Sequence, residues 1–207
     1  MKALWRFFGF LVRWTGLLVV PGGALWVLSP IGASISETAF GTPNVFWKLF
    51  PSAPLLLLAG LVGLQIRQSG RSGILEKVGF WLAALGLLLV IAGDAGLFWL
   101  GLDDTFIMTA PAYRAFRLGL LLVGVGSILF GVGAPRDGDL PTWGLLPFVV
   151  GCLCGLISFA VDLGYFGTVL WMLFGLGWAW LGLSLAVDGF LSWRAGRPAR
   201  GTATAGG

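Results

Sequence analysis

Few side chains in this 207-residue chain are equipped for chemistry, and the most unusual of them is Asp94. It lies inside the apolar stretch Gly79–Gly101, which reads GFWLAALGLLLVIAGDAGLFWLG. An ionisable residue within a membrane-spanning segment is costly and therefore marks a candidate functional site. We expect Asp94 to be the strongest such candidate in the chain.

A comparison of depth along two neighbouring apolar segments gives Asp94 an expected partner. Asp94 lies seven residues before Gly101, which is about 10 Å along a helix. Arg117 lies six residues after Pro111, which is about 9 Å. We therefore predict an Asp94–Arg117 ion pair between two antiparallel helices. Arg114 lies one turn closer to the helix end, where it would share Asp94 or meet the acids that follow Gly101.

This group of charges has two interpretations. Paired buried charges often serve structure, so the favoured interpretation is a structural ion pair that holds the two helices together, which we call a clip. The alternative is a gate, or a proton or substrate site, that opens to the outer face of the membrane. Asp162 would join Asp94, Arg114 and Arg117 in that polar site if the ends of the segments converge, although an aspartate beside Gly164 is also typical of a turn.

The other charged residues near apolar segments have simpler expected roles. Arg13 should extend its side chain to the inner lipid headgroups and bind phosphate there. Asp188 is expected at the inner interface, with Arg194 as its neighbour. Cys152 and Cys154 are two residues apart, so on a helix they point to different sides and are small core residues.

Composition excludes several classes of function. Histidine is absent, which removes the commonest metal ligand and the usual general base near neutral pH. No catalytic motif stands out, and the serines have no residue to activate them. We therefore expect no metal, no cofactor and no enzymatic activity. The net charge of +4 comes without a basic block, so nucleic acid is not an expected partner.

The overall composition is that of an integral membrane protein. Hydrophobic residues make up 57% of the chain and charged residues only 11%, against about 25% charged in a typical soluble domain. A span needs about 20 apolar residues. Six segments meet or approach that length, and we predict an all-α bundle of six transmembrane helices: Phe7–Leu28, Val45–Ile66, Gly79–Gly101, Ala112–Gly133, Trp143–Val161 and Tyr165–Leu191.

The basic residues orient this bundle. With the N-terminus in the cytoplasm, ten Lys and Arg residues fall at cytoplasmic ends and three at outer ends, as the positive-inside rule requires. An even number of spans then places both termini inside, as three hairpins. The first segment is expected to remain as a span and not to be cleaved as a signal peptide, since Arg13 and Pro21 interrupt it. A weak parallel repeat of the three hairpins is left open.

Small residues at seven-residue spacing mark the faces on which the helices should pack. Examples are Gly79, Gly86 and Gly93 in the third segment and Gly119, Gly126 and Gly133 in the fourth. Burying leucine gains little in lipid, so close approach of backbones through glycine is the expected source of stability. Tryptophans at segment ends, among them Trp26 and Trp99, predict interfacial belts.

Residues 1–193 are therefore expected to form a single transmembrane domain, and residues 194–207 a flexible cytoplasmic tail. The expected location is a bacterial-type plasma membrane, with the lipid bilayer as the first partner and a membrane protein or a second copy as a further one. Low polarity favours a structural, accessory or interaction role. A small-solute or ion transporter or channel around Asp94, Arg117 and Asp162 is the alternative, and a membrane-embedded enzyme would lack a positioned nucleophile.

Overall fold

The protein is an all-helical bundle in this computed structural model. The backbone of residues 2–40, 44–68, 73–100, 111–134, 142–161 and 165–194 is described, together with the side chains in these ranges except those of 2–13, 37–40, 44, 142, 165 and 189–194. Six helical segments are long and apolar enough to cross a membrane. Each overlaps one of the predicted spans, so the predicted all-α class and the number of spans are confirmed.

The first span is longer than the sequence predicts. Helix α1 covers Lys2–Phe40 and passes through Pro21 and Pro30. Residues 30–40, which the predicted spans leave to an outer connection, are therefore helical instead. A proline removes one hydrogen bond from a helix interior. In apolar surroundings, however, the remaining backbone groups have no water to bind, and the helix continues.

The second span is interrupted where two prolines follow Phe50. Helix α2 covers Asn44–Leu49, and helix α3 covers Ser52–Gln68. Proline is tolerated in the first turn of a helix, where its missing N–H would be unsatisfied in any case. Pro54 occupies such a position in α3. The break turns Phe50 into the bundle, where its side chain is fully buried.

The third span changes its helical type near one end. Helix α4 covers Ile74–Asp94 and continues without a gap into the π-helix η1, Ala95–Trp99. The Leu100 N–H donates to the Ala95 carbonyl five residues earlier, at 3.1 Å. A π-helical turn is rare and is found frequently at functional sites. The remaining spans are α5, α6 and α7, at Pro111–Gly133, Thr142–Ala160 and Tyr165–Arg194.

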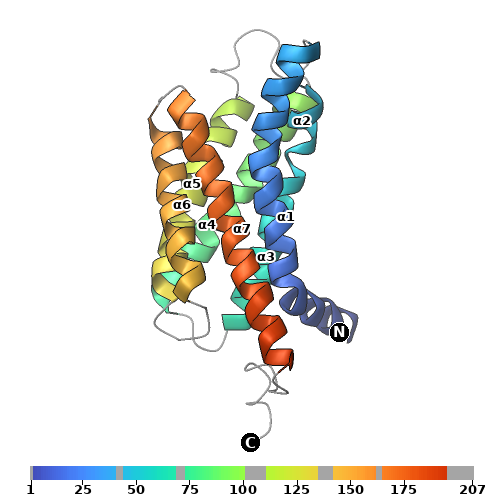
Figure 1. Cartoon of the computed structure of the whole chain (residues 1–207), viewed down its shortest axis with the longest axis vertical. Coiled ribbons are helices and arrows are strands. Elements are labelled where there is room, and N and C mark those ends of the chain that lie inside the picture. Colours follow the sequence, from blue (N-terminus) through green and yellow to red (C-terminus); the bar gives the residue numbers. More distant parts are fainter. Residues whose placement is uncertain are drawn as a thin grey trace, which may run out of the picture.

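The six spans pack as a closed ring in chain order. Helix α4 packs against α3 and α5, α6 packs against α5 and α7, and α1 packs against both α3 and α7. Figure 1 shows the first and last helices side by side, with the start of α1 and the end of α7 at the same end of the bundle. Short helix α2 lies at the opposite end, which we call the Asp94 end because α4 finishes there.

Glycine brings neighbouring helices into backbone contact, most extensively α4 and α5. A Cβ atom added at Gly86 would lie 2.5 Å from the Val123 nitrogen and 2.7 Å from the Gly119 oxygen. A Cβ at Gly93 would lie 2.6 Å from the Phe116 nitrogen. Contacts continue along the whole α4–α5 interface at seven-residue intervals. We call this interface the glycine seam, and it confirms the predicted packing faces.

A second interface of the same kind joins the first and last spans. A Cβ at Gly16 would lie 2.7 Å from the Gly182 oxygen, and one at Gly175 would lie 2.9 Å from the Gly23 oxygen. The small-residue spacing of α1 and α7 therefore closes the ring. Because these glycine faces are used inside the fold, leucine, valine and tryptophan side chains dominate the exposed surface, as expected of a surface that faces lipid.

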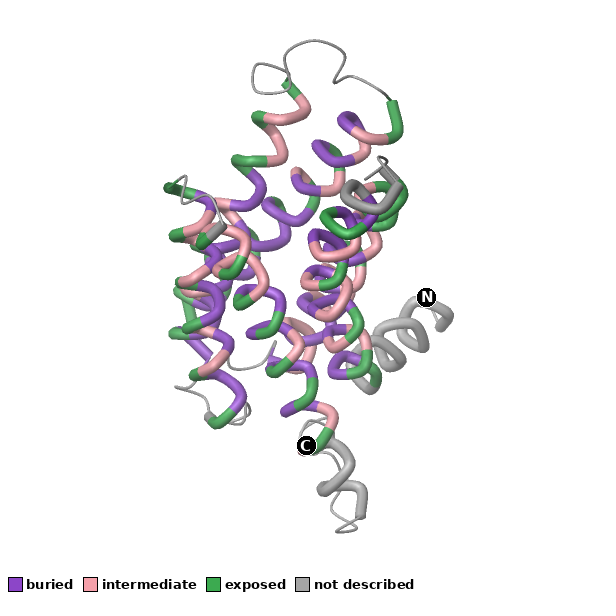
Figure 2. Tube along the Cα trace, turned by 45° about the horizontal axis from the view of Figure 1, so that its top comes forward, coloured by how far each residue is buried: buried purple, intermediate pink, exposed green. Residues whose placement is uncertain are grey.

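Apolar side chains fill the interior of the ring. One contiguous core draws buried residues from all six spans, and Figure 2 shows the buried positions following the inward sides of the helices. Trp178 is fully buried and packs edge-on against Phe148, with ring centroids 4.9 Å apart. Trp26 was predicted at the interface, but its side chain is fully buried.

Candidate functional site

Eight aromatic rings meet at the Asp94 end of the ring of helices. Phe50 lies 5.0 Å from Trp26, 6.0 Å from Trp171 and 6.2 Å from Phe116, measured between ring centroids. Every one of the six spans contributes at least one ring. We call this group the aromatic plug, and it comprises Trp26, Trp47, Phe50, Phe98, Phe116, Phe159, Trp171 and Phe174.

Asp94 lies close to this plug. Phe98, four residues further along, stacks in parallel on Trp47 with centroids 5.5 Å apart. On the other side, the backbone of Gly93 meets that of Phe116, whose ring belongs to the plug. Four residues of helix correspond to about 6 Å. Asp94 is therefore about one turn from Phe98 along its helix and close to the level of Phe116, and its side chain is fully buried.

The carboxyl group of Asp94 has no partner in the part of the chain that the structure describes. Neither Oδ1 nor Oδ2 accepts a hydrogen bond. The predicted Asp94–Arg117 pair is therefore not formed. A buried polar group without a partner costs about 1–3 kcal/mol, and a charged one costs more. Such a group in a native fold needs an explanation beyond packing.

Arg117 serves a different contact. Its guanidinium Nη2 donates to the Phe159 carbonyl oxygen at 2.9 Å. Phe159 lies in the last turn of α6, where backbone carbonyls lack helical partners and a positive charge is favourable. Arg117 thus joins α5 to the end of α6. Arg114, which was expected to share Asp94, has an exposed side chain.

The directions in which Asp94 and Arg117 point around their helix axes explain why they do not pair, although they lie at similar depth. Gly93 and Phe116 occupy the facing positions of the α4–α5 interface. Asp94 and Arg117 each come one residue later, and one residue turns the side chain by about 100° around a helix. Both side chains are thus turned away from the shared interface, and Arg117 reaches α6 instead.

Two predicted site residues have side chains that the structure does not describe. Asp162 lies outside the described residues, and the side chain of Arg13 does as well. The convergence of Asp162 with Asp94 therefore stays a prediction, as does headgroup binding by Arg13. Near the expected position of Asp162, the Ser158 hydroxyl donates to the Gly167 carbonyl at 2.7 Å and joins α6 to α7.

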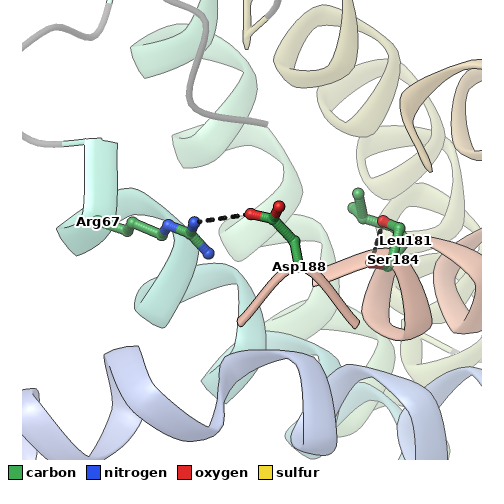
Figure 3. Close-up of polar contacts among 4 residues, drawn as sticks. All are labelled: Arg67, Leu181, Ser184 and Asp188. Carbon is green, nitrogen blue, oxygen red and sulfur yellow. Dashed lines mark hydrogen bonds and ion pairs between the residues drawn. The ribbon is translucent and has the colours of Figure 1, made fainter. Parts of the chain in front are cut away.

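The opposite end of the bundle holds an ion pair that the sequence did not indicate. Arg67 Nη2 lies 3.6 Å from Asp188 Oδ2, and Figure 3 shows the two side chains extending toward each other from α3 and α7. Asp188 was expected beside Arg194, whose side chain lies outside the described residues, so that contact stays a prediction. The side chains are 29% and 49% exposed, which limits the stability that the pair can contribute.

Glu76 is the buried acid that sequence reasoning missed. Its side chain is fully buried in the first turn of α4. The predicted third span began at Gly79, so Glu76 fell outside it. The signal was present, because Glu76, Phe80, Ala83, Leu87, Val90 and Asp94 follow alternating steps of four and three residues, the spacing of one buried helix face.

The described residues contain no group of three or more His, Cys, Asp or Glu side chains that could hold a metal ion. Six apolar helices indicate a multi-pass membrane protein. Comparisons of the chain with protein-family models, with curated proteins and with solved structures find no match.

Proposed function

We propose that this protein is a non-enzymatic, multi-pass protein of a bacterial-type plasma membrane that binds and moves a small solute or ion at its Asp94 end. Both termini would lie in the cytoplasm, in accord with the distribution of basic residues. The observation that supports the proposal is the fully buried Asp94 carboxyl, whose two oxygens lack partners among the described residues.

The contacts of Arg117 argue against a structural explanation of Asp94. A clip between α4 and α5 needs a cationic partner, and Arg117 is engaged with the Phe159 carbonyl. Meanwhile the α4–α5 interface is already held by glycine contacts along its length. A buried acid without a hydrogen-bond partner is a cost, and proteins retain such costs mainly where function requires them.

The local backbone adds to this argument. The α-helix ends at Asp94, and the π-helix η1 begins with the next residue. A π-turn interrupts the regular hydrogen-bond ladder next to the acid, and turns of this kind are found frequently at functional sites. The acid, the irregular turn and the plug therefore coincide in one short region of the third span.

The packed interior favours a transporter over an open channel. The described core is apolar and continuous, and the aromatic plug lies across one end of it. A solute could reach Asp94 only after side chains move, which is the behaviour of a protein with alternating access.

A structural or accessory role is the second candidate, and the close packing favours it. Two glycine-lined interfaces make a compact ring whose exposed surface is apolar. In this case the protein would associate with another membrane protein through its leucine- and valine-rich outer face. Native mass spectrometry in lipid would then reveal a stoichiometric protein partner.

Flux measurements separate the two candidates. Purified protein in proteoliposomes would be assayed for flux of protons, sodium and choline, with Asp94→Asn as the test variant and Asp188→Asn as the matched control. We expect flux that Asp94→Asn abolishes and Asp188→Asn preserves. Flux unchanged by Asp94→Asn would overturn the proposed site, and absence of all three fluxes together with a stoichiometric partner would establish the accessory role.

The proposed orientation has its own test. Fusions of a cytoplasmic fluorescent reporter and of a periplasmic phosphatase to the C-terminus report opposite sides of the membrane. We expect the fluorescent fusion to be active and the phosphatase fusion to be inactive, and the reverse pattern would reject the assignment of both termini to the cytoplasm.

A further inference from the structure

The aromatic plug and Asp94 together offer one negative group and many ring faces. We propose that the ligand of this site is a small organic cation, such as a quaternary ammonium or amine, with a hydrogen-bond acceptor close to its charge. This inference rests on the solute-binding function proposed above and names the chemical class of the solute.

The charge of the ligand follows from Asp94 and the rings. The Asp94 carboxyl lacks a partner among the described residues, and the arginine at matching depth is engaged elsewhere. Aromatic faces carry negative electrostatic potential, so they attract a cation and repel an anion. A cation between the carboxyl and the plug would gain from both features.

The same surroundings favour an organic over an inorganic cation. Metal ions such as Ca²⁺ take six or more oxygen ligands, and Mg²⁺ requires a near-ideal octahedron of them. The described residues contain no group of three or more His, Cys, Asp or Glu side chains that could contribute to such a set. A quaternary ammonium ion is weakly hydrated and can be enclosed by aromatic rings instead of oxygens.

Two indole N–H groups point to the acceptor on the ligand. The Nε1 atoms of Trp26 and Trp171 in the plug, like that of Trp178 outside it, are buried and have no hydrogen-bond partner in the described part of the chain. Their rings stack at 5.5 Å within the plug. Buried tryptophan normally finds a partner for its N–H. A hydroxyl or carbonyl oxygen near the charge of the ligand would supply it.

Entry requires the rings to separate, because their centroids now lie only 4.9–6.2 Å apart across the plug. Trp47 and Phe98 are half-buried, as are Phe116 and Trp171, and Phe98 belongs to η1. Parting this stack would expose ring faces and open a route toward Asp94, one turn from Phe98. The ligand would then exchange ring–ring contacts for ring–cation contacts.

The test uses two probes of the same shape and different charge. Choline and its neutral isostere 3,3-dimethylbutan-1-ol would be titrated into the full-length protein in lipid nanodiscs, with binding followed by calorimetry and by tryptophan fluorescence. We expect saturable choline binding. The affinity of the isostere should be lower than that of choline by about tenfold or more. Equal affinity for the two probes would overturn the inference.

Two variants assign the binding to the site. Asp94→Asn keeps the shape of the side chain and should weaken choline binding about tenfold or more, whereas Asp188→Asn should not change it. Trp26→Phe keeps a ring and removes the N–H, and should weaken choline more than tetramethylammonium, which has no acceptor. Elution of each variant as the wild-type species in size-exclusion chromatography controls for folding.

Different experimental outcomes would reject the ligand class and the transport function. If neither choline nor tetramethylammonium binds, but another solute shows Asp94-dependent flux, the cation assignment is wrong and the transport function stands. If choline binds in an Asp94-dependent manner without any flux, the assignment of the ligand class stands and the transport function is wrong. Choline binding that is unaffected by Asp94→Asn would place the ligand elsewhere and overturn the inference.

Discussion

Adding one methyl group to the glycine seam should separate two helices, and Gly119→Ala is the clearest way to test it. A Cβ at Gly119 would lie 2.7 Å from the Gly86 oxygen and 2.7 Å from the Val90 nitrogen. Both are backbone atoms, so no side chain can rotate away. Ordinary contact begins at 3.4 Å, so the backbones of α4 and α5 must move apart by about 0.7 Å.

Gly124→Ala on the same helix is the matched control. Its added Cβ would lie 3.3 Å from the Cβ and Cδ1 atoms of Leu156, and the nearest backbone atom, the Leu156 Cα, is at the ordinary contact distance of 3.5 Å. Each substitution replaces glycine by a better helix former, which favours the helix by about 1 kcal/mol in both cases. That contribution cancels in the comparison. The difference between the two variants therefore measures packing across the seam alone.

The expected difference follows from the cost of overpacking. Forcing a methyl group into a closely packed site costs about 1–3 kcal/mol. We expect Gly119→Ala to be less stable than Gly124→Ala by about 2 kcal/mol, which is roughly a 30-fold change in the unfolding equilibrium constant. Reversible unfolding in mixed detergent–lipid micelles, followed by far-UV circular dichroism, would measure it.

A double mutant sharpens the result. Gly86 faces Gly119, and each added Cβ would meet the backbone oxygen of the other residue. Once one methyl group has separated the helices, the second meets a gap that already exists. The combined cost of Gly86→Ala and Gly119→Ala should therefore be smaller than the sum by about 1 kcal/mol. Equal stability of Gly119→Ala and Gly124→Ala would refute the view that backbone contact holds these helices together.

Three further predictions concern the charged residues. Asp94→Ala should leave the free energy of unfolding unchanged or raise it by about 1 kcal/mol, because it removes an unpartnered buried group; a loss above 1 kcal/mol would reveal a stabilising partner. Arg117→Ala removes the donor to the Phe159 carbonyl and should cost about 1 kcal/mol, with Arg117→Lys recovering part of it; an unchanged unfolding curve would contradict that role. Asp188→Asn, which breaks the half-exposed pair with Arg67, should cost less than about 0.5 kcal/mol in the same assay.

The position of Asp94 illustrates how far sequence reasoning reached. Its depth in the third span could be counted, and that count is consistent with the contact between Gly93 and Phe116. Its partner could not be derived, because pairing depends on rotation about each helix axis. A shift of one residue turns a side chain by about 100°, which is enough to separate two groups at equal depth.

Glu76 and Trp26 also separate what the sequence predicts from what tertiary contacts decide. Glu76 follows the spacing of the buried face of α4, but its place at the edge of the apolar run left it outside the predicted span. Trp26 has the composition and position of an interfacial anchor, yet it is fully buried among rings from other helices. Burial of a residue near a helix end depends on which neighbours cover it.

The sequence by itself determined the class and the packing faces of this protein. Apolar length is a local property, and a bilayer sets the length that a helix needs, so the six spans follow from composition. Glycine spacing is also local, so the faces on which the helices meet could be predicted. Only the tertiary structure decided which faces meet. It joins Gly23 to Gly175 and gathers the aromatic plug from all six spans, because contacts between distant segments depend on how the whole ring closes.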